Sequence, residues 1–489
     1  MSLLSFRERV DVMRWIGTFL LLVLGSAVLA RDRVSRPNVL FVVVDDLNDW
    51  TTVYDPDNPI KTPNLERLAS RGVFFSQAYC VSPACNPSRV ATMTGLRPTT
   101  TGVYGNKSDW RKALPGVVTI PQHFMAHGYH VTGAGKIFHH HFDSAFHDEG
   151  SFHHFLKLAR HPMPPRRMNG ITNWVGGRGG GPTLPIFDWG PWPPDEKDTP
   201  DYKSVDYARN YLGQDQGRPF FLAVGIFRPH SPFFAPKEYF NSYPPGQFKD
   251  PPGRENDRED LPCGGHQMLK KGKPFLYRTM VAHKQLSRAI QAYAACATFA
   301  DAQVGRLLDA LDRSAHAGNT LVVLWSDHGF HLGEKQHWEK FALWEKTTRS
   351  PVIVAGPGAG KGGRRCEEPV SLLDLYPTLV DLCGLRKKPE LEGLSLAPWL
   401  RGEVPNRARP VLTTWGRGNH ALRSPRWRYI RYADGSEELY DHENDPDDWH
   451  NLAADPKPEH EQVMAGLRKW FPAREAPQVA DMLSSKEQE

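Results

Sequence analysis

The sequence is poor in cysteine and in net charge, and each shortage argues against a class of protein. Its six cysteines include no pair in a Cys-x-x-Cys spacing, so a zinc framework is not predicted. The formal net charge of +5 over 489 residues is too small to indicate nucleic acid as a partner. Apolar residues make up 40% of the chain, which is ordinary for a globular protein with one large domain and a smaller one.

The N-terminal apolar run is short for a membrane span, which needs roughly 20 residues. This run, WIGTFLLLVLGSAVLA, follows Arg7, Arg9 and Arg14, ends in small residues and is succeeded by polar sequence. We therefore predict a signal peptide at residues 1–30, cleaved after Ala30. The mature protein is expected to be periplasmic or secreted, or lysosomal or extracellular in a eukaryote, with no stable membrane association. An uncleaved membrane anchor is the alternative.

Long apolar runs rich in β-branched residues predict strands that are buried on both faces of a sheet. They occupy residues 38–46, 219–226, 320–329 and 351–356. A helix is expected from Pro63, with Thr62 as its N-cap and Gly72 after its end, and a long helix over residues 286–311. Strands that alternate with helices predict an α/β sandwich with a large, mostly parallel sheet, assigned to residues 31–384.

Beyond residue 384 the pattern changes to short strand-like pieces followed by an amphipathic tail. The pieces PVLTTW, WRYIRY and EELYD and the tail PEHEQVMAGLRKWF predict a smaller domain over residues 385–489, with an antiparallel sheet and a closing helix. Within the larger domain, residues 163–201 show no period. We expect this irregular insertion to border the active site, because long loops in compact domains are usually functional.

Acidic residues follow two of the predicted strands. Asp45 and Asp46 end the first strand, and Asp327 with His328 ends the third. Open α/β sheets bind ligands at the carboxyl ends of their strands, and carboxylates gathered there repel one another unless a cation lies between them. Hard oxygen ligands favour Ca²⁺ or Mg²⁺. Acidic pairs at strand ends also form turns and helix caps, so this pattern alone leaves both interpretations open.

The stretch VSPACNPSRVATMTG places Cys85 just before a predicted helix start. Pro87 and Ser88 suit the first turn of that helix, so Cys85 is expected to face a helix N-terminus, with the donors of Arg89 beside it. Such a position stabilises a thiolate or an oxyanion. The alternative is a small buried cysteine or a disulfide partner for Cys80.

Cys85, Pro87, Ser88 and Arg89 match the C-x-P-S-R signature of the type I sulfatases, and the chain resembles that family. The signature lies after the first acidic pair and before AGKIFHH, FRPHSPF and SDHG, in the order that the family shows. The resemblance covers almost all of the sequence after the predicted signal peptide. It implies an alkaline-phosphatase-like sandwich and a hydrolase of sulfate esters. It also implies that a formylglycine-generating enzyme oxidises Cys85 to formylglycine, whose hydrate is the nucleophile.

The resemblance further assigns roles to side chains of this sequence. One Ca²⁺ is expected to be held by Asp45, Asp46, Asp327, His328 and the formylglycine formed from Cys85. Lys136 and Lys340 are expected to hold the sulfate oxygens, and His230 to act as the general acid for the leaving alcohol. His139 and Arg89 are expected to bond the formylglycine hydrate. Taken without the combined motifs, either lysine would be interpreted as a surface residue.

Within the family, AGKIFHH, FFLAVGIFRPHSPFFAPKEYF and SDHGFHLGEKQHWEK resemble the iduronate-2-sulfatase branch and its bacterial members. The resemblance implies a sulfated glycan, including glycosaminoglycans and other sulfated polysaccharides, as substrate, and exo-action at a chain end. The segment TWGRGNHALR offers Arg417, His420 and Arg423 to a carboxylate or second sulfate of that substrate. Two other functions stay open: a phosphoester hydrolase on the same scaffold, and a non-catalytic relative that binds glycans.

Overall fold

The computed structural model describes residues 36–139, 146–171, 187–248, 253–271, 273, 275–403, 405 and 409–482. The predicted signal peptide, residues 1–30, lies outside this part of the chain. Residues 38–489 group into one compact unit, and the predicted division at residue 384 stays a prediction. Among the described residues, no helix combines the length and the apolar character that crossing a membrane requires.

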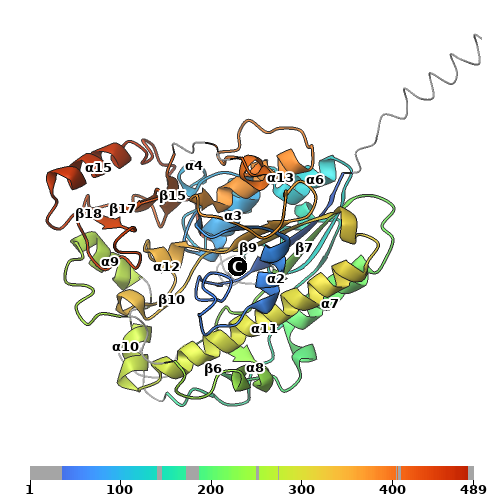
Figure 1. The fold of residues 1–489 in the computed structure, drawn as a ribbon, viewed down its shortest axis with the longest axis horizontal. Coiled ribbons are helices and arrows are strands. Elements are labelled where there is room, and N and C mark those ends of the chain that lie inside the picture. The colour runs from blue at the N-terminus through green and yellow to red at the C-terminus, as the bar shows by residue number, and fades with distance from the viewer. Residues whose placement is uncertain are drawn as a thin grey trace, which may run out of the picture. The chain divides into compact units, whose positions relative to one another are not determined.

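An eight-stranded sheet lies at the centre of the fold (Figure 1). Its strands, in spatial order, are β13 (Arg364–Cys366), β2 (Gly72–Phe75), β12 (Val352–Ala355), β9 (Thr320–Ser326), β1 (Asn38–Val44), β7 (Phe220–Ile226), β4 (His130–Gly135) and β5 (His154–Leu156). Strand β1 runs parallel to β7 and β9, whereas β12 runs antiparallel to both of its neighbours. The predicted large, mostly parallel sheet is confirmed, and the reversed direction of β12 is what the apolar pattern left undetermined.

Side chains alternate along β1 and build a separate core on each face of the sheet. Leu40 and Val42 belong to one apolar cluster, and Val39 and Phe41 belong to the other. The first face is covered by α2 (Pro63–Arg71), α7 (Pro200–Leu212) and α11 (Leu286–Arg313), and the second by α3 (Cys85–Thr94), α6 (Ile120–Ala126) and α13 (Leu375–Leu382) (Figure 1). Helices on both faces of the sheet make the predicted α/β sandwich.

Helix α11 also supplies the cap of helix α2. The carboxylate of Asp301 accepts hydrogen bonds from the main-chain N–H groups of Asn64 and Leu65, at 3.1 and 2.8 Å. Thr62 occupies the position before the helix, but its side chain makes no capping bond. Thr62 is thus the N-cap residue, as predicted, but its side chain does not make the cap, because a carboxylate more than two hundred residues away takes the same donors.

A four-stranded antiparallel sheet follows, as predicted for the C-terminal part. It consists of β15 (Val411–Thr414), β16 (His420–Arg423), β17 (Trp427–Arg431) and β18 (Glu437–Asp441), and helix α15 (Pro458–Arg468) closes it. Tyr429 on one face packs in a cluster with Met464 of α15. Tyr440 on the other face packs in a cluster with Trp344, whose Nε1 donates to Glu438 over 2.8 Å. The small sheet therefore rests on the segment around residue 344.

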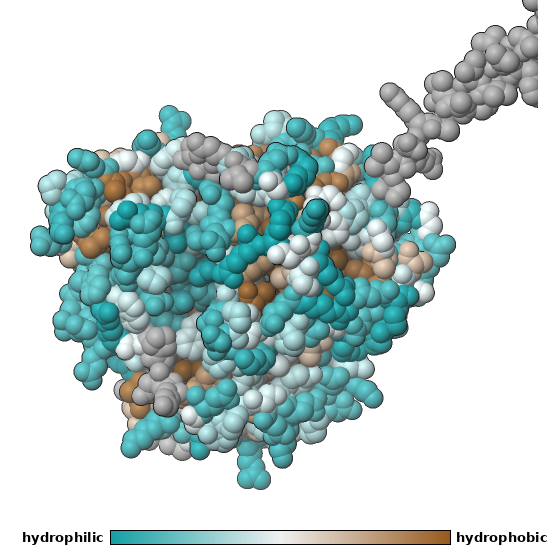
Figure 2. All heavy atoms as spheres, viewed as in Figure 1, coloured by the Kyte–Doolittle hydropathy of each residue, from teal (hydrophilic) through white to brown (hydrophobic). Residues whose placement is uncertain are grey.

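Shorter elements connect these layers. They are β3 (Ala78–Tyr79), α4 (Pro98–Thr101), α5 (Trp110–Ala113), β6 (Trp189–Pro191), β8 (Phe233–Ala235), α8 (Lys237–Asn241), α9 (Cys263–Lys271), α10 (Phe275–Ala282), β10 (His331–Leu332), β11 (Trp338–Glu339), α12 (Glu345–Thr348), β14 (Val370–Ser371) and α14 (Ala397–Arg401). Strand β6 lies in the predicted irregular insertion and pairs with β8; residues 172–186 of that insertion lie outside the described chain. On the face seen in Figure 1, hydrophilic residues predominate and apolar residues form small, separate patches (Figure 2).

Candidate functional site

Two neighbouring strands end at the candidate site and carry its acidic residues. Because β1 and β9 are parallel, Asp45 and Asp327, which follow them directly, meet at one edge of the sheet. The main-chain N–H of Asp46 donates to Oδ1 of Asp327 over 3.2 Å. Asp46 has a φ of 62°, in the left-handed region, and the hydroxyl of Tyr293 holds this turn by donating to the Asp46 carbonyl over 2.8 Å. This turn directs the side chains of Asp45 and Asp46 toward residue 85.

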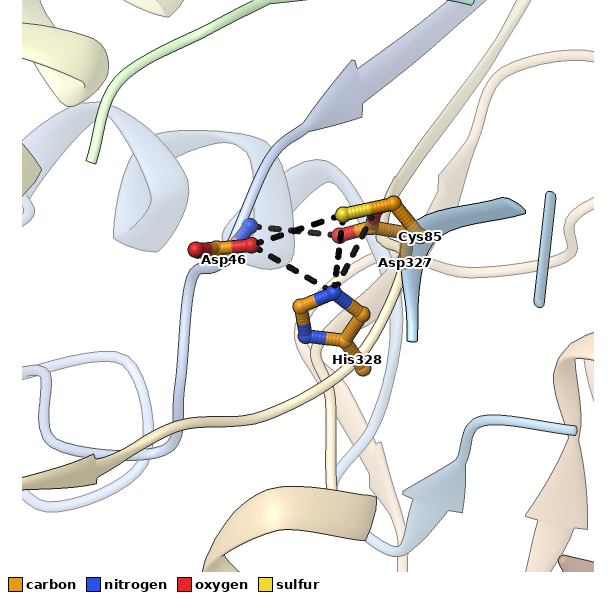
Figure 3. A group of neighbouring side chains, drawn as sticks. All are labelled: Asp46, Cys85, Asp327 and His328. Atoms are coloured by element: carbon orange, nitrogen blue, oxygen red, sulfur yellow. Dashed lines mark hydrogen bonds and ion pairs between the residues drawn. The ribbon is translucent and has the colours of Figure 1, made fainter. Parts of the chain in front are cut away.

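Four buried side chains point toward one another at this edge (Figure 3). The ligand-type atoms of Asp46, Cys85, Asp327 and His328 all lie within 4.8 Å of one another. Sγ of Cys85 is 3.4 Å from Nε2 of His328, and that nitrogen is 3.3 Å from Oδ1 of Asp46. Asp45, Asp46 and His230 form a second such group. The structure thus brings four of the five expected ligands into one group, and Asp45 joins Asp46 in the second.

The chemistry of this donor set fits a hard cation. Nδ1 of His328 lies 2.9 Å from the Gly329 carbonyl, which only accepts, so Nδ1 carries a proton and Nε2 faces the cluster. Burial alone would lower the pKa of His328, but the carboxylates of Asp327 and Asp46 raise it to about 9. The cluster therefore attracts positive charge. Carboxylate oxygens with one imidazole suit Ca²⁺ once the sulfur of Cys85 is replaced by oxygen.

Arg89, a residue of α3, bonds to the acidic residues at the ends of both strands. Its fully buried guanidinium donates to Asp327 through Nε and to Asp45 through Nη2, both over 2.8 Å. Nη1 donates to the carbonyls of Lys136 and Ile137, over 2.6 and 3.0 Å. These bonds occupy the guanidinium with carboxylates and carbonyls, and none of them reaches Cys85. The contact of Arg89 with a formylglycine hydrate accordingly stays a prediction.

Cys85 is the first residue of α3 and is surrounded by cations. The sulfur stands where an oxygen on Cβ of a formylglycine would be, so its contacts mark the surroundings of that oxygen. Nζ of Lys340 is 3.0 Å from Sγ, and Nζ of Lys136 is 3.7 Å from it. Burial raises the pKa of the Cys85 thiol, but Lys136, Lys340 and His328 outweigh burial and hold it well below the usual range. Cys85 makes no disulfide with Cys80.

The two lysines are anchored by the acidic residues. Lys136, which follows β4, forms an ion pair with Asp45, and Lys340 is 2.7 Å from Oδ1 of Asp46. Their side chains are 1% and 3% exposed. Burial by itself lowers the pKa of Lys340, but Asp46 and Cys85 raise it well above the ordinary value. The Lys340 ammonium is therefore charged, and the acidic residues hold both lysines in place beside Cys85.

Two predicted histidines lie near this group. Burial lowers the pKa of His139 to about 4, and the neighbouring Cys85 opposes that shift. His230 has its Nε2 3.9 Å from Oδ2 of Asp46 and its Nδ1 2.7 Å from the Ser231 carbonyl. The His230 side chain is 20% exposed, so it stands where the buried cluster opens to solvent.

Arg417 and His420 are not brought to this cluster by any described contact. His420 is buried, with Nδ1 2.9 Å from the Thr414 hydroxyl and Nε2 3.2 Å from Glu475. Arg417 donates to the carbonyl of Glu475 over 3.4 Å. Arg423 is buried beside Glu345. Their proposed contacts with substrate stay predictions, because the structure pairs each of these groups with a partner inside the protein.

Sequence reasoning missed the residues that hold His230. The carboxylate of Asp201, from α7, accepts hydrogen bonds from the main-chain N–H groups of Phe227 and Arg228, at 2.6 and 3.1 Å. Nη1 of Arg228 donates to the His230 carbonyl over 3.0 Å. Arg228 lies in the same FRPHSPF motif as His230, whereas Asp201 belongs to no motif, so no pattern in the sequence could have identified its contacts.

Comparison with known proteins agrees with this geometry. The Sulfatase family profile matches residues 37–385, and the profile of the C-terminal region of N-sulphoglucosamine sulphohydrolase matches residues 333–475. A protein of Formosa agariphila described as a sulfatase is 39% identical over 431 residues, covering 86% of this chain and 83% of that protein. Human iduronate 2-sulfatase is 32% identical over 425 residues, covering 77% of this chain and 74% of the human protein.

A solved structure of a 2-O GAG sulfatase shares the fold, with a TM-score of 0.69, 24% identity, and coverage of 89% of this chain and 91% of that one. The family profile extends over most of the chain, from before β1 to the end of α13. It includes the strand ends and the start of α3, where the acidic cluster and Cys85 lie. This chain is therefore a member of the sulfatase family, the enzymes that hydrolyse sulfate esters.

Proposed function

We propose that this protein removes sulfate from a sulfated carbohydrate, as an exo-acting hydrolase similar to iduronate-2-sulfatase. The observation that carries the proposal is the pair of buried lysines beside residue 85. Lys136 and Lys340 hold their ammonium groups 3.7 and 3.0 Å from Sγ. Fixed cations beside a nucleophile suit a substrate whose reacting group carries negative charge on three oxygens, because charge then develops next to preorganised partners.

The choice of sugar rests on the similarity to human iduronate 2-sulfatase, at 32% identity. That similarity favours a 2-O-sulfated uronate at the non-reducing end of a glycosaminoglycan. We also propose export of the protein after cleavage of residues 1–30. In this proposal residues 31–384 form the catalytic domain, and residues 385–489 complete the substrate pocket.

The proposed chemistry at residue 85 depends on its modification by a formylglycine-generating enzyme. A formylglycine hydrate offers one hydroxyl to attack sulfur and a second whose deprotonation expels sulfate, which a cysteine or a serine lacks. Bound Ca²⁺, held by Asp45, Asp46, Asp327 and His328, would add positive charge for the sulfate oxygens. Arg89 keeps Asp45 and Asp327 in place for that ion through its buried bonds.

The remaining steps belong to side chains of the chain itself. Lys136 and Lys340 bind the sulfate oxygens and neutralise them where water is excluded, since both lysines are almost fully buried. His139 lies beside residue 85 and accepts or donates a bond to its hydroxyls. His230 stands at the open side of the cluster and protonates the oxygen of the departing sugar.

The proposal is tested by sulfate release from a disaccharide with 2-O-sulfated iduronate at its non-reducing end. The protein should contain formylglycine at residue 85, confirmed by the mass of the peptide that contains it, and Cys85→Ala serves as the control. Release that the control lacks supports both the nucleophile and the substrate class. Fully converted protein that releases no sulfate from this disaccharide, or from a panel of sulfated glycans, contradicts the proposal.

A further inference from the structure

His161 lies at the start of the irregular insertion and packs beside the catalytic groups. Its ring centre is 4.3 Å from that of Phe227, and the ring of His230 is 4.7 Å from the same phenyl ring. Nζ of Lys136 lies 5.2 Å from that ring. Phe227 therefore contacts both His161 and His230, so the two histidines lie near each other around one phenyl ring.

The contacts of His161 determine which of its ring nitrogens carries the proton. Nη2 of Arg228 lies 3.4 Å from Nδ1 of His161. A guanidinium only donates hydrogen bonds, so Nδ1 is the acceptor and Nε2 carries the hydrogen of a neutral ring. Burial and the charge of Arg228 hold the pKa of His161 well below its usual range, which agrees with a neutral ring.

Nε2 of His161 is a buried donor without a partner. No described residue lies within hydrogen-bond distance of this atom. Leaving a buried N–H group unpaired is costly, and native structures rarely do so unless a water, an ion or a ligand takes the bond. The donor therefore indicates a missing acceptor on the side of His161 away from Arg228.

Arg228 identifies the charge of that acceptor. Its guanidinium is buried and donates to the carbonyls of Phe234 and His230, over 2.6 and 3.0 Å. Within the described chain no carboxylate forms an ion pair with it, since Asp201 uses its oxygens for main-chain N–H groups. A buried cation without an ion-pair partner favours an anion nearby. A carboxylate would accept the hydrogen bond from Nε2 of His161 and also balance the charge of Arg228, whereas a hydroxyl would only accept the hydrogen bond.

We infer that His161 is a specificity-determining residue that donates its Nε2–H to the carboxylate of the sugar bearing the scissile sulfate. This inference rests on the proposed function and names the group that makes a uronate preferred over a neutral sugar. In a 2-O-sulfated uronate the carboxylate lies across the ring from the sulfate. With the leaving oxygen at His230, the far side of the sugar is within reach of His161, since both histidines contact Phe227.

Binding tests this inference without turnover. The full chain carrying Cys85→Ala, loaded with Ca²⁺, is titrated by calorimetry with methyl 2-O-sulfo-iduronide and with its carboxyl-reduced analogue. We expect the uronide to bind about tenfold more tightly than the reduced sugar, as one hydrogen bond to a charged group provides. Adding His161→Phe should remove that preference and leave the affinity for the reduced sugar unchanged. Adding His161→Asn, which keeps an N–H donor, should restore part of it.

The matched control is His154→Phe, because His154 is an exposed histidine of β5 stacked on Tyr207. This change should leave both affinities unaltered. Equal binding of the two sugars by the parent, or an equal loss of both with His161→Phe, overturns the inference. Sulfate release by the unmutated enzyme is measured separately. Sulfate release without a preference for the carboxylate supports the proposed function and overturns this inference. A preference for the carboxylate without sulfate release supports the role of His161 in binding and contradicts the proposed function.

Discussion

The hydrogen bond between His230 and its own loop determines which of its nitrogens can serve as an acid. The Ser231 carbonyl, 2.7 Å from Nδ1, only accepts, so Nδ1 is protonated and Nε2 is the nitrogen facing Asp46. For Nε2 to deliver a proton, the ring must carry a hydrogen on both nitrogens. His230→Gln removes this donor while keeping a polar side chain at the position.

The size of the effect follows from how open the position is. General acid catalysis raises the rate by about 10²- to 10⁴-fold. The His230 side chain is 20% exposed, so in the variant a water molecule can reach the leaving oxygen and supply part of this effect. We therefore expect His230→Gln to lower kcat/KM on a sugar sulfate by about 10²- to 10³-fold, or roughly 3–4 kcal/mol in activation free energy. With para-nitrophenyl sulfate, whose leaving group departs as a stable anion, the loss should be less than about tenfold.

The comparison of leaving groups and a nucleophile control give an independent check of the same role. Cys85→Ala should abolish turnover of both substrates at every pH. An equal loss on the sugar and aryl substrates would refute the acid role of His230, because a proton donor matters only where the leaving group needs one.

Three further outcomes are expected. Arg89→Lys keeps one charge but cannot reach two carboxylates and two carbonyls, so the free energy of unfolding from urea titration should fall by about 3 kcal/mol; an unchanged midpoint would contradict the tie between the strands. Burial and Arg258 hold the pKa of His337 near 3, so the neutral ring favours the folded state above about pH 6.5 and that stability is lost as pH falls toward 3. His337→Gln should therefore lose less stability than the wild type over that range, and parallel acid-unfolding curves would exclude the effect. Removing Ca²⁺ with a chelator should lower Tm and adding it back should restore Tm, while a stoichiometric zinc signal in elemental analysis would exclude calcium as the resident ion.

Several elements of the fold were predictable because the signals that form them are local. Strands β1 and β9 are uninterrupted apolar runs, and the acidic residues directly after them had to meet once the two strands were neighbours. Helix α11 follows from its apolar period. The same reasoning could not establish the direction of β12, because a short apolar run is buried equally well in either orientation.

Other parts of the site depend on features that no period encodes. Lys340 lies between Glu339 and Phe341, which both adopt left-handed backbone conformations, so its direction toward Cys85 is set by the loop rather than by a helix or strand. The strand that holds His420 has no apolar run that would predict it, since TWGRGNHALR is rich in polar residues and glycine. In the structure Nε2 of His420 lies 3.2 Å from Glu475, from a distant part of the chain.

The small C-terminal sheet packs on the segment around Trp344, and this contact limits how sulfatases can exchange parts. Glu438 of β18 accepts the indole N–H of Trp344, and the buried Asp448 accepts the main-chain N–H of Glu345, only a few residues after Lys340. A chimera that takes this sheet from another sulfatase, as a cassette for new specificity, must bring acidic groups at both positions. Without them the indole of Trp344 loses its partner, the segment behind Lys340 loosens, and a gain in sugar range is accompanied by a loss of turnover.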